Sequence, residues 1–179
     1  NPDMALKLVM NPATDDHISA VGSGDLQIGI IDDVISLYGN YIVDHGSYRL
    51  SLQDVIHKNF DLIQGSSVVF DGDAMNAHLD ITASHTVNQV PLKDLAAEAV
   101  SMGNERVNCL LKIGGTLNAP TLGFDLELPQ GTEEQKNLVR SNTSTEEQMN
   151  MQFVYLLGLG RFYTYDATQT TEGTQGGSS

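Results

Sequence analysis

The chain has 179 residues, which is enough for one domain with a sizeable apolar core. Nine Lys and Arg residues against 23 Asp and Glu residues give a formal net charge of −14. Nucleic-acid binding needs basic residues that replace phosphate counterions, so this balance excludes a DNA- or RNA-binding protein. The same charge disfavours electrostatic docking to anionic lipid head groups, but it does not exclude binding of lipid through its acyl chains.

The chain lacks the marks of a disulfide-stabilised or membrane-spanning protein. Its single cysteine, Cys109, cannot form an internal disulfide, and its place on an apolar stripe favours a buried side chain over a nucleophile. No apolar run approaches the ~20 residues of a spanning helix. Residue 1 is Asn within a pattern that already reads as a folded domain, so we expect a fragment excised from a longer protein.

Alternation of apolar and polar side chains recurs along the chain and predicts strands with one apolar face and one wet face. In chain order, the apolar stripes are Met4, Leu6, Leu8 and Met10; Leu26, Ile28 and Ile30; Tyr48, Leu50 and Leu52; Met75, Ala77, Leu79, Ile81 and Ala83; Val107, Cys109, Leu111 and Ile113; and Phe124, Leu126 and Leu128. Turn signals separate them, including residues 22–25, 32–33, 39–40 and 45–47. The pattern predicts a mainly β fold with long antiparallel strands, one of them over residues 75–87.

Two segments have helical rather than strand spacing. Residues 92–102 are predicted to form a short helix that ends at Gly103. Residues 144–158 are predicted to form a second helix, because Ser144 and Glu147 have the spacing of a capping box.

The remaining segments are polar. Residues 129–143 are predicted to be a mobile linker, and residues 167–179 a disordered tail rich in Thr, Gly, Gln and Ser. The predicted organisation is therefore one β domain over residues 1–166, with the linker and the second helix inside it.

A metal site must be considered where acidic and histidine residues crowd a short segment. The candidates are Asp71, Asp73, His78, Asp80 and His85. A zinc site needs three or four converging ligands, whereas here only His78 and Asp80 share the polar face of one strand. We therefore favour a solvated strand face after an acidic turn.

Catalytic motifs are equally weak. Ser66 lacks the G-x-S-x-G pattern of a nucleophile elbow, and Asp125 and Glu127 lie on the wet face of one strand. The tyrosines at 38, 41 and 48 alternate in a way that favours packing over a sugar-binding platform. We expect no enzyme activity and no cofactor.

The one-faced strands need cover, and few helices are available to supply it. Either the sheet folds on itself and fills its own core, or it stays partly open and holds hydrocarbon. The sequence leaves both alternatives open.

Two ordered motifs carry a family resemblance. The first comprises Gly65-Ser66, Phe70, Gly72-Asp73, Ala77, Leu79-Asp80-Ile81 and Ala83. The second comprises Val107, Leu111, Ile113, Gly115, Leu117, Pro120, Phe124-Asp125 and Leu128-Pro129. Together they resemble the C-terminal domain of the TamB family over roughly residues 18–165. The chain departs from the family pattern at Ala74, usually proline, and at His85, commonly tyrosine. From the resemblance we expect the family's domain to continue past the last residue of this chain.

The resemblance implies a fold and a place in the cell. It implies a long β-groove or taco-like solenoid with an apolar interior, in the periplasm, as part of a protein that is anchored in the inner membrane and reaches the outer membrane. The implied partners are phospholipid acyl chains and an outer-membrane barrel of the Omp85 family, TamA-like or BamA-like. The implied roles are glycerophospholipid passage and assembly of outer-membrane proteins.

Our leading hypothesis is therefore a non-enzymatic module whose apolar stripes line a groove. The candidate lipid-facing residues are Leu26, Ile28, Ile30, Leu50, Leu52, Met75, Ala77, Leu79, Ile81, Ala83, Val107, Leu111, Ile113, Phe124, Leu126 and Leu128. The alternative is a purely structural β-solenoid or sandwich segment with a filled core and no ligand.

Overall fold

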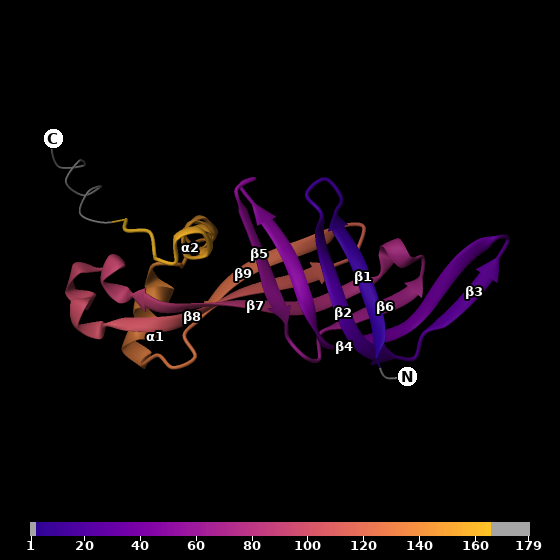
Figure 1. The fold of residues 1–179 in the computed structure, drawn as a ribbon, viewed down its shortest axis with the longest axis horizontal. Helices are drawn as coiled ribbons and strands as arrows, with labels where there is room; N and C mark the ends of the chain where they lie inside the picture. The colour runs from indigo at the N-terminus through magenta and orange to yellow at the C-terminus, as the bar shows by residue number, and fades with distance from the viewer. Residues whose placement is uncertain (1–2, 166–179) are drawn as a thin grey trace. The chain divides into compact units, whose positions relative to one another are not determined.

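The computed structural model describes residues 3–165, and its secondary structure is mainly β (Figure 1). Within those residues, nine strands form a connected sheet in the order β1-β2-β4-β5-β7-β8-β9, with β3 paired to β4, and β6 paired to β4 and β7. The strands are β1 (Met4–Asn11), β2 (Asp16–Gly24), β3 (Gln27–Ile31), β4 (Val34–Leu52), β5 (Ile56–Leu62), β6 (Ser67–Gly72), β7 (His78–Pro91), β8 (Asn104–Gly115) and β9 (Pro120–Glu127). The helices are α1 (Glu133–Ser141), α2 (Glu146–Leu159) and the short 3-10 helices η1 (Ala74–Asn76), η2 (Leu92–Asp94) and η3 (Ala97–Met102). The prediction of a mainly β, antiparallel fold with short helices is confirmed.

The chain divides into two compact units. Unit 1 comprises Asn1–His85 and Leu110–Asp125, and unit 2 comprises Thr86–Cys109 and Leu126–Ser179. Strands β7, β8 and β9 contribute residues to both units.

Unit 1 covers the apolar side of its own sheet. Strands β1, β2 and β5 run across the direction of β7, β8 and β9 (Figure 1). Its interior is filled by side chains from both sets of strands, among them Ile18, Leu50, Phe60, Ile81 and Leu111, each at most 2% exposed. Burial of such side chains contributes about 1.5–3 kcal/mol each and is the main stabilising term of this unit.

The central strand of unit 1 is β4, which pairs with four other strands. Along one side it pairs with β3 at residues 34–38 and then with β2 at residues 41–49. Along the other side it pairs with β6 at residues 37–42 and then with β5 at residues 47–52. The register against β2 shifts at one point, where Val21 pairs with His45 but Gly22 pairs with Val43, so Asp44 is an extra residue in β4. Such a bulge bends the strand and increases its twist, and it lies where β5 replaces β6 as the neighbour of β4.

The bulge also changes which side chains face the interior. Before it, Tyr41 and Val43 are buried at odd positions; after it, Tyr48 and Leu50 are buried at even positions. Strand residues alternate between faces, so one extra residue is needed to keep both pairs on the inner side. The sequence analysis placed turns at 39–40 and 45–47, and this was wrong, because β4 is continuous there and only its alternation changes phase.

The connection between β5 and β6 is tied to β7 through the side chain of Ser66. Its hydroxyl donates to the carbonyl of Ile63 at 2.7 Å and accepts from the backbone N–H of Thr82 at 3.1 Å. Ser66 is 7% exposed, so water does not readily replace these bonds. Ser66 therefore has a structural role at the point where the chain changes partner.

Other segments differ from the sequence-based predictions in detail. The strand predicted over 75–87 begins at His78, because Asp73 caps the 3-10 helix η1 by accepting from the backbone N–H of Met75. The helix predicted over 92–102 is two 3-10 helices, η2 and η3, with a break at Leu95 and Ala96.

Unit 2 contains a helix that the sequence analysis missed. The segment 129–143, predicted to be a mobile linker, contains α1, which begins with a capping box between Thr132 and Gln135. Helix α2 begins with a capping box between Thr145 and Gln148, one residue after the predicted pair of Ser144 and Glu147. The tail predicted over 167–179 lies outside the described residues.

A buried amide closes the C-terminal part of unit 2. Gln152 on α2 is fully buried, accepts from the backbone N–H of Tyr163 at 2.7 Å and donates to the Tyr163 carbonyl at 3.0 Å. The two bonds pair both the donor and the acceptor of the buried amide with the main chain of Tyr163, as an antiparallel strand partner would. They fix the chain after α2 against the helix.

We expect Ser66→Ala to lower the free energy of unfolding by about 1–3 kcal/mol, because the partly buried N–H of Thr82 loses its acceptor. Urea denaturation followed by circular dichroism measures this change. The neighbouring, half-exposed Ser67 provides the control, since Ser67→Ala should change stability by less than about 0.5 kcal/mol. Equal effects of the two substitutions would contradict the role given to Ser66.

Candidate interaction surface

The candidate lipid-facing residues have three different environments. Thirteen of the sixteen lie in unit 1, and Val107, Leu126 and Leu128 lie in unit 2. Nine are at most 6% exposed: Leu50, Ala77, Leu79, Ile81, Ala83, Val107, Leu111, Ile113 and Leu128. Four are half-buried: Leu26, Leu52, Phe124 and Leu126. Three are exposed: Ile28, Ile30 and Met75.

Five strongly exposed apolar side chains gather on β3 and the facing end of β4. Ile28, Ile30, Ile31, Val34 and Ile35 are between 62% and 72% exposed. Strand β3 pairs only with β4, over Gln27↔Tyr38 to Ile31↔Val34, and this two-stranded ribbon projects from the rest of unit 1 (Figure 1). We call residues 27–38 the β3–β4 ribbon.

One face of the β3–β4 ribbon is wholly apolar. Because Ile28 pairs with Leu37 and Ile30 pairs with Ile35, these four side chains share a face. The other face carries Gln27, Gly29 and Ser36 beside its apolar residues. We call the face that carries Ile28, Ile30, Ile35 and Leu37 the apolar ribbon face.

The apolar ribbon face continues the interior of unit 1. Along β4, Leu37 is followed at every second position by Gly39, Tyr41 and Val43, and Tyr41 and Val43 are 1% exposed. On the neighbouring strand β6, Phe70 pairs with Gly39 and is 4% exposed. One stripe therefore runs from a packed core to a region where the same kind of side chain meets solvent.

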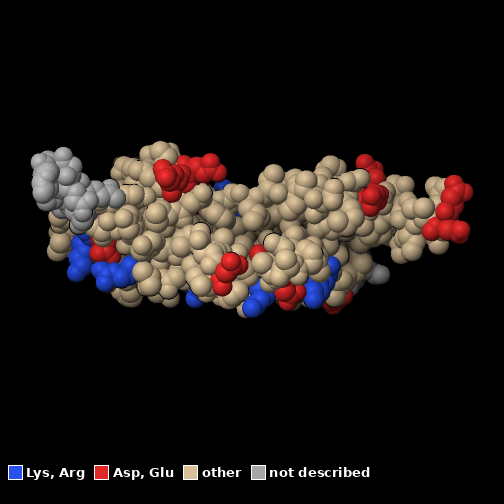
Figure 2. All heavy atoms as spheres, turned by 90° about the horizontal axis from the view of Figure 1, so that it is seen from above, with Lys and Arg blue, Asp and Glu red and all other residues tan. Residues whose placement is uncertain are grey.

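The ribbon is acidic at its end and has no basic residues. Between Lys7 and Arg49 the chain contains six aspartates and neither Lys nor Arg. Asp32 and Asp33 form the turn, and carboxylate groups mark this end of the molecule in Figure 2. The net field here repels anions.

The acidic and histidine residues considered for a metal site have separate structural roles. Asp73 caps η1, and the ring of His85 lies 5.6 Å from that of Phe60 while its Nδ1 is 3.2 Å from the Asn59 carbonyl. Across residues 3–165, no group of three or more His, Cys, Asp or Glu side chains is placed to hold a metal ion. Asp125 lies 3.5 Å from Lys112 in a half-exposed ion pair, and Glu127 accepts from Asn108.

Two of the three clustered tyrosines pack in the core. Tyr41 and Tyr48 are each 1% exposed, whereas Tyr38, on the ribbon, is 43% exposed. Burial, followed by the charge of Asp16, raises the pKa of Tyr48 to about 12, so its phenol stays protonated. This agrees with packing rather than with a sugar-binding platform.

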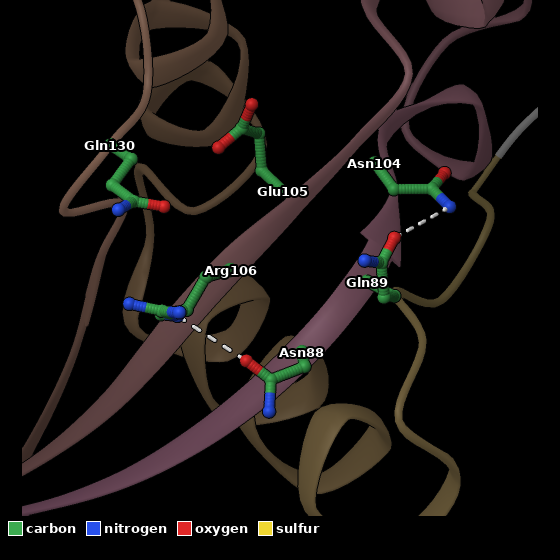
Figure 3. Close-up of a pocket in the computed structure, with 6 residues that line it drawn as sticks. All are labelled: Asn88, Gln89, Asn104, Glu105, Arg106 and Gln130. Atoms are coloured by element: carbon green, nitrogen blue, oxygen red, sulfur yellow. Dashed lines mark hydrogen bonds between the residues drawn. The ribbon is translucent and has the colours of Figure 1, made fainter.

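A polar pocket of about 250 Å³ lies in unit 2 (Figure 3). Its lining is Asn88, Gln89, Asn104, Glu105, Arg106 and Gln130. Arg106 donates to Asn88 at 3.3 Å and Asn104 donates to Gln89 at 3.5 Å, so much of the lining is bonded to itself. These are cross-strand pairs between β7 and β8, and they suit neither an acyl chain nor a nucleophile with its base.

A second depression crosses β7, β8 and β9 within unit 1. It has a volume of about 420 Å³, and Gly114 and Gly123 in its lining leave space because they have no side chains. Its lining mixes Asp80, Thr82 and Lys112 with Ile81 and Leu122. The mixed character fits a strand surface better than a specific ligand site.

The sequence predicted half of the ribbon. It predicted the stripe with Ile28 and Ile30 and a turn at Asp32-Asp33, but not the strand after the turn that holds their partners Ile35 and Leu37. The signal was present, since Asp32 and Asp33 separate two β-branched runs in the manner of a two-residue hairpin turn.

Comparison with known proteins gives one match. The family model for the TamB C-terminal domain matches residues 1–179, the whole chain. Neither the curated proteins nor the solved structures contain a match. Over the described residues, every helix is too short or too polar to cross a membrane.

We expect Cys109 to resist alkylation in the folded protein. Burial raises the pKa of its thiol to about 12, so the reactive thiolate is scarce at pH 8 and the sulfur is shielded. Because folding raises this pKa from 9.0, the thiol also makes the folded state less stable as pH rises from about 9 to about 12. Iodoacetamide labelling followed by mass spectrometry should show slow labelling at pH 8 and rapid labelling in urea; rapid labelling without urea would contradict this burial.

Proposed function

Because the chain belongs to the family of TamB C-terminal domains, which act in the translocation and assembly module of the cell envelope, we propose that it is a periplasmic module that shields phospholipid acyl chains. The family is non-enzymatic. In this proposal the domain is part of a protein that is anchored in the inner membrane and reaches the outer membrane. It works beside an outer-membrane barrel of the Omp85 family, since the family acts with TamA-like partners.

The observation that supports this proposal is the apolar ribbon face. Ile28, Ile30 and Ile35 are 72%, 68% and 68% exposed, yet they continue a stripe that is buried farther along β4. Exposed apolar area of this kind is costly in water and marks interaction sites in folded proteins. An acyl chain on this face would gain about 0.8 kcal/mol for each methylene fully removed from water.

The charge of the chain agrees with recognition of acyl chains rather than head groups. A net charge of −14 and the aspartates of the ribbon repel anionic head groups. Apolar contact is non-directional and does not depend on the head group. The module would therefore accept phospholipids with different head groups.

A structural role without ligand is the second candidate. Nine of the sixteen candidate lining residues are at most 6% exposed and pack against other side chains, which is what a filled core requires. In that case the ribbon would serve contact with other protein segments alone.

We expect the purified domain to bind a fluorescent long-chain fatty acid and to co-purify with phospholipid that mass spectrometry detects. The double substitution Ile28→Ser/Ile35→Ser should weaken probe binding by about ten-fold or more, because it removes two apolar side chains from the apolar ribbon face. Fluorescence titration gives the dissociation constants.

A matched control lies on the other face of the same ribbon. Ile31→Ser/Val34→Ser changes two residues of similar exposure and should leave probe binding within about two-fold. Absence of phospholipid and of probe uptake in the unsubstituted domain would favour the structural role. Equal loss with both double substitutions would show that the effect comes from the ribbon's stability and not from its apolar face.

A further inference from the structure

Strand β3 has an outer edge without the features that usually protect an exposed edge. Natural edge strands are blunted by Lys, Pro, charged residues or bulges. Strand β1 contains Lys7 and an irregular register between Val9 and Asn11, and β9 begins with Pro120. Strand β3 reads Gln-Ile-Gly-Ile-Ile and has none of these features.

The register indicates which main-chain groups β3 offers. Ile31 and Val34 flank the two-residue turn, so they form the hydrogen-bonded pair that closes it. Hydrogen-bonded and non-hydrogen-bonded pairs alternate in an antiparallel ladder. Ile28 and Ile30 are then non-hydrogen-bonded to β4, and their N–H and C=O groups point to the outer edge.

The turn at the end of β3 combines strain with charge. Asp32 and Asp33 have φ angles of 53° and 66°, the left-handed conformation that Asn-Gly adopts more easily in a two-residue hairpin turn. The two adjacent carboxylates also repel each other. A turn chosen for hairpin stability alone would not have this composition.

From these observations we propose that the outer edge of β3 is a strand-addition site. Its partner is an extended protein segment with alternating apolar side chains, running antiparallel to β3, with basic residues at the N-terminal end that meets Asp32 and Asp33. Main-chain bonds to Ile28 and Ile30 would supply affinity, and the acidic turn would set direction and register.

Other occupants fit the ribbon less well. A membrane surface rich in anionic lipid would be repelled by Asp25, Asp32 and Asp33. A second copy would bring two acidic chains together, and the ten paired residues of the ribbon are fewer than the roughly 20–30 per partner of a stable interface. A basic, apolar strand satisfies both the charge and the open ladder.

The test uses the whole chain and a fluorescent peptide of two lysines followed by alternating valine and threonine. The key comparison is Ile30→Pro against Ile30→Ala. Both remove the side chain, but only proline removes the outward N–H, and an outward position on an edge strand tolerates proline. Fluorescence anisotropy should give a dissociation constant at least about ten-fold weaker for Ile30→Pro than for Ile30→Ala. Hydrogen exchange should show slower exchange at Ile28 and Ile30 in the presence of the peptide.

The acidic turn has its own test. Asp32→Asn/Asp33→Gly should keep or raise the melting temperature, because Asn-Gly relieves the turn, and yet weaken peptide binding by about three-fold or more. A peptide with glutamates in place of the lysines should bind the unsubstituted chain correspondingly less well. If the substitutions acted by destabilising the fold, the melting temperature and the peptide affinity would fall together. A fall in affinity alone therefore reports the loss of the two carboxylates.

Several results would overturn the proposal. These are equal binding by Ile30→Pro and Ile30→Ala, equal binding of the lysine and glutamate peptides, binding of phosphatidylglycerol vesicles but not of the peptide, or dimerisation in sedimentation that Ile30→Pro abolishes. Failure of the acyl-chain function can be told apart from failure of strand addition. Uptake of the fatty acid should be the same for Ile30→Pro and Ile30→Ala, whereas peptide binding should differ between them.

Discussion

The arrangement of unit 1 depends on keeping one face of β4 turned inward while the strand changes partners. On one side β4 pairs first with β6 and then with β5, and the bulge at Asp44 lies between these two pairings and within the pairing to β2 on the other side. Without the extra residue, either Tyr41 and Val43 or Tyr48 and Leu50 would face solvent. Exposing two such side chains would cost several kcal/mol, comparable to the whole stability of a small domain. The connection that contains Ser66 is bonded to β4 beside the bulge, since the N–H of Val43 donates to the Ser66 carbonyl at 2.7 Å and the N–H of Gly65 donates to the Val43 carbonyl at 2.9 Å.

The same constraint explains how far the sequence predicted the fold. Alternation identified the strands that contain Leu8, Ile81 and Leu111, because each has one buried face with a regular alternation. It failed in β4, where a change of phase with Gly46 nearby has the appearance of a turn between two strands. It also missed α1, because that helix buries little beyond Gln135 and Val139, and its polar composition matches that of a linker. The capping box of Thr132 and Gln135 was the local signal that outweighed composition.

Exposure could not be predicted at all from the alternation. Ile28 and Ile81 occupy equivalent places in their stripes, yet one is 72% exposed and the other 1%. The difference comes from cover: Ile81 has the rest of unit 1 above it, while Ile28 lies beyond the last strand that could pack on it. The residues that the sequence predicted to line a groove therefore fall into two groups, a filled core and an uncovered ribbon. Only the residues of the ribbon are available to a ligand or partner.

The bulge at Asp44 also sets how this chain can change in length. Substitutions at exposed positions of β4 leave its phase intact, but adding or deleting one residue between Leu37 and Leu50 would turn one half of the strand inside out. Two compensating changes would be needed at once, one on each side of the bend, and the intermediate would be poorly folded. Length variation in this domain should accordingly be confined to hairpin ends such as Asp32–Asp33 and Gln53–Asp54, where a residue more or less alters no inward face.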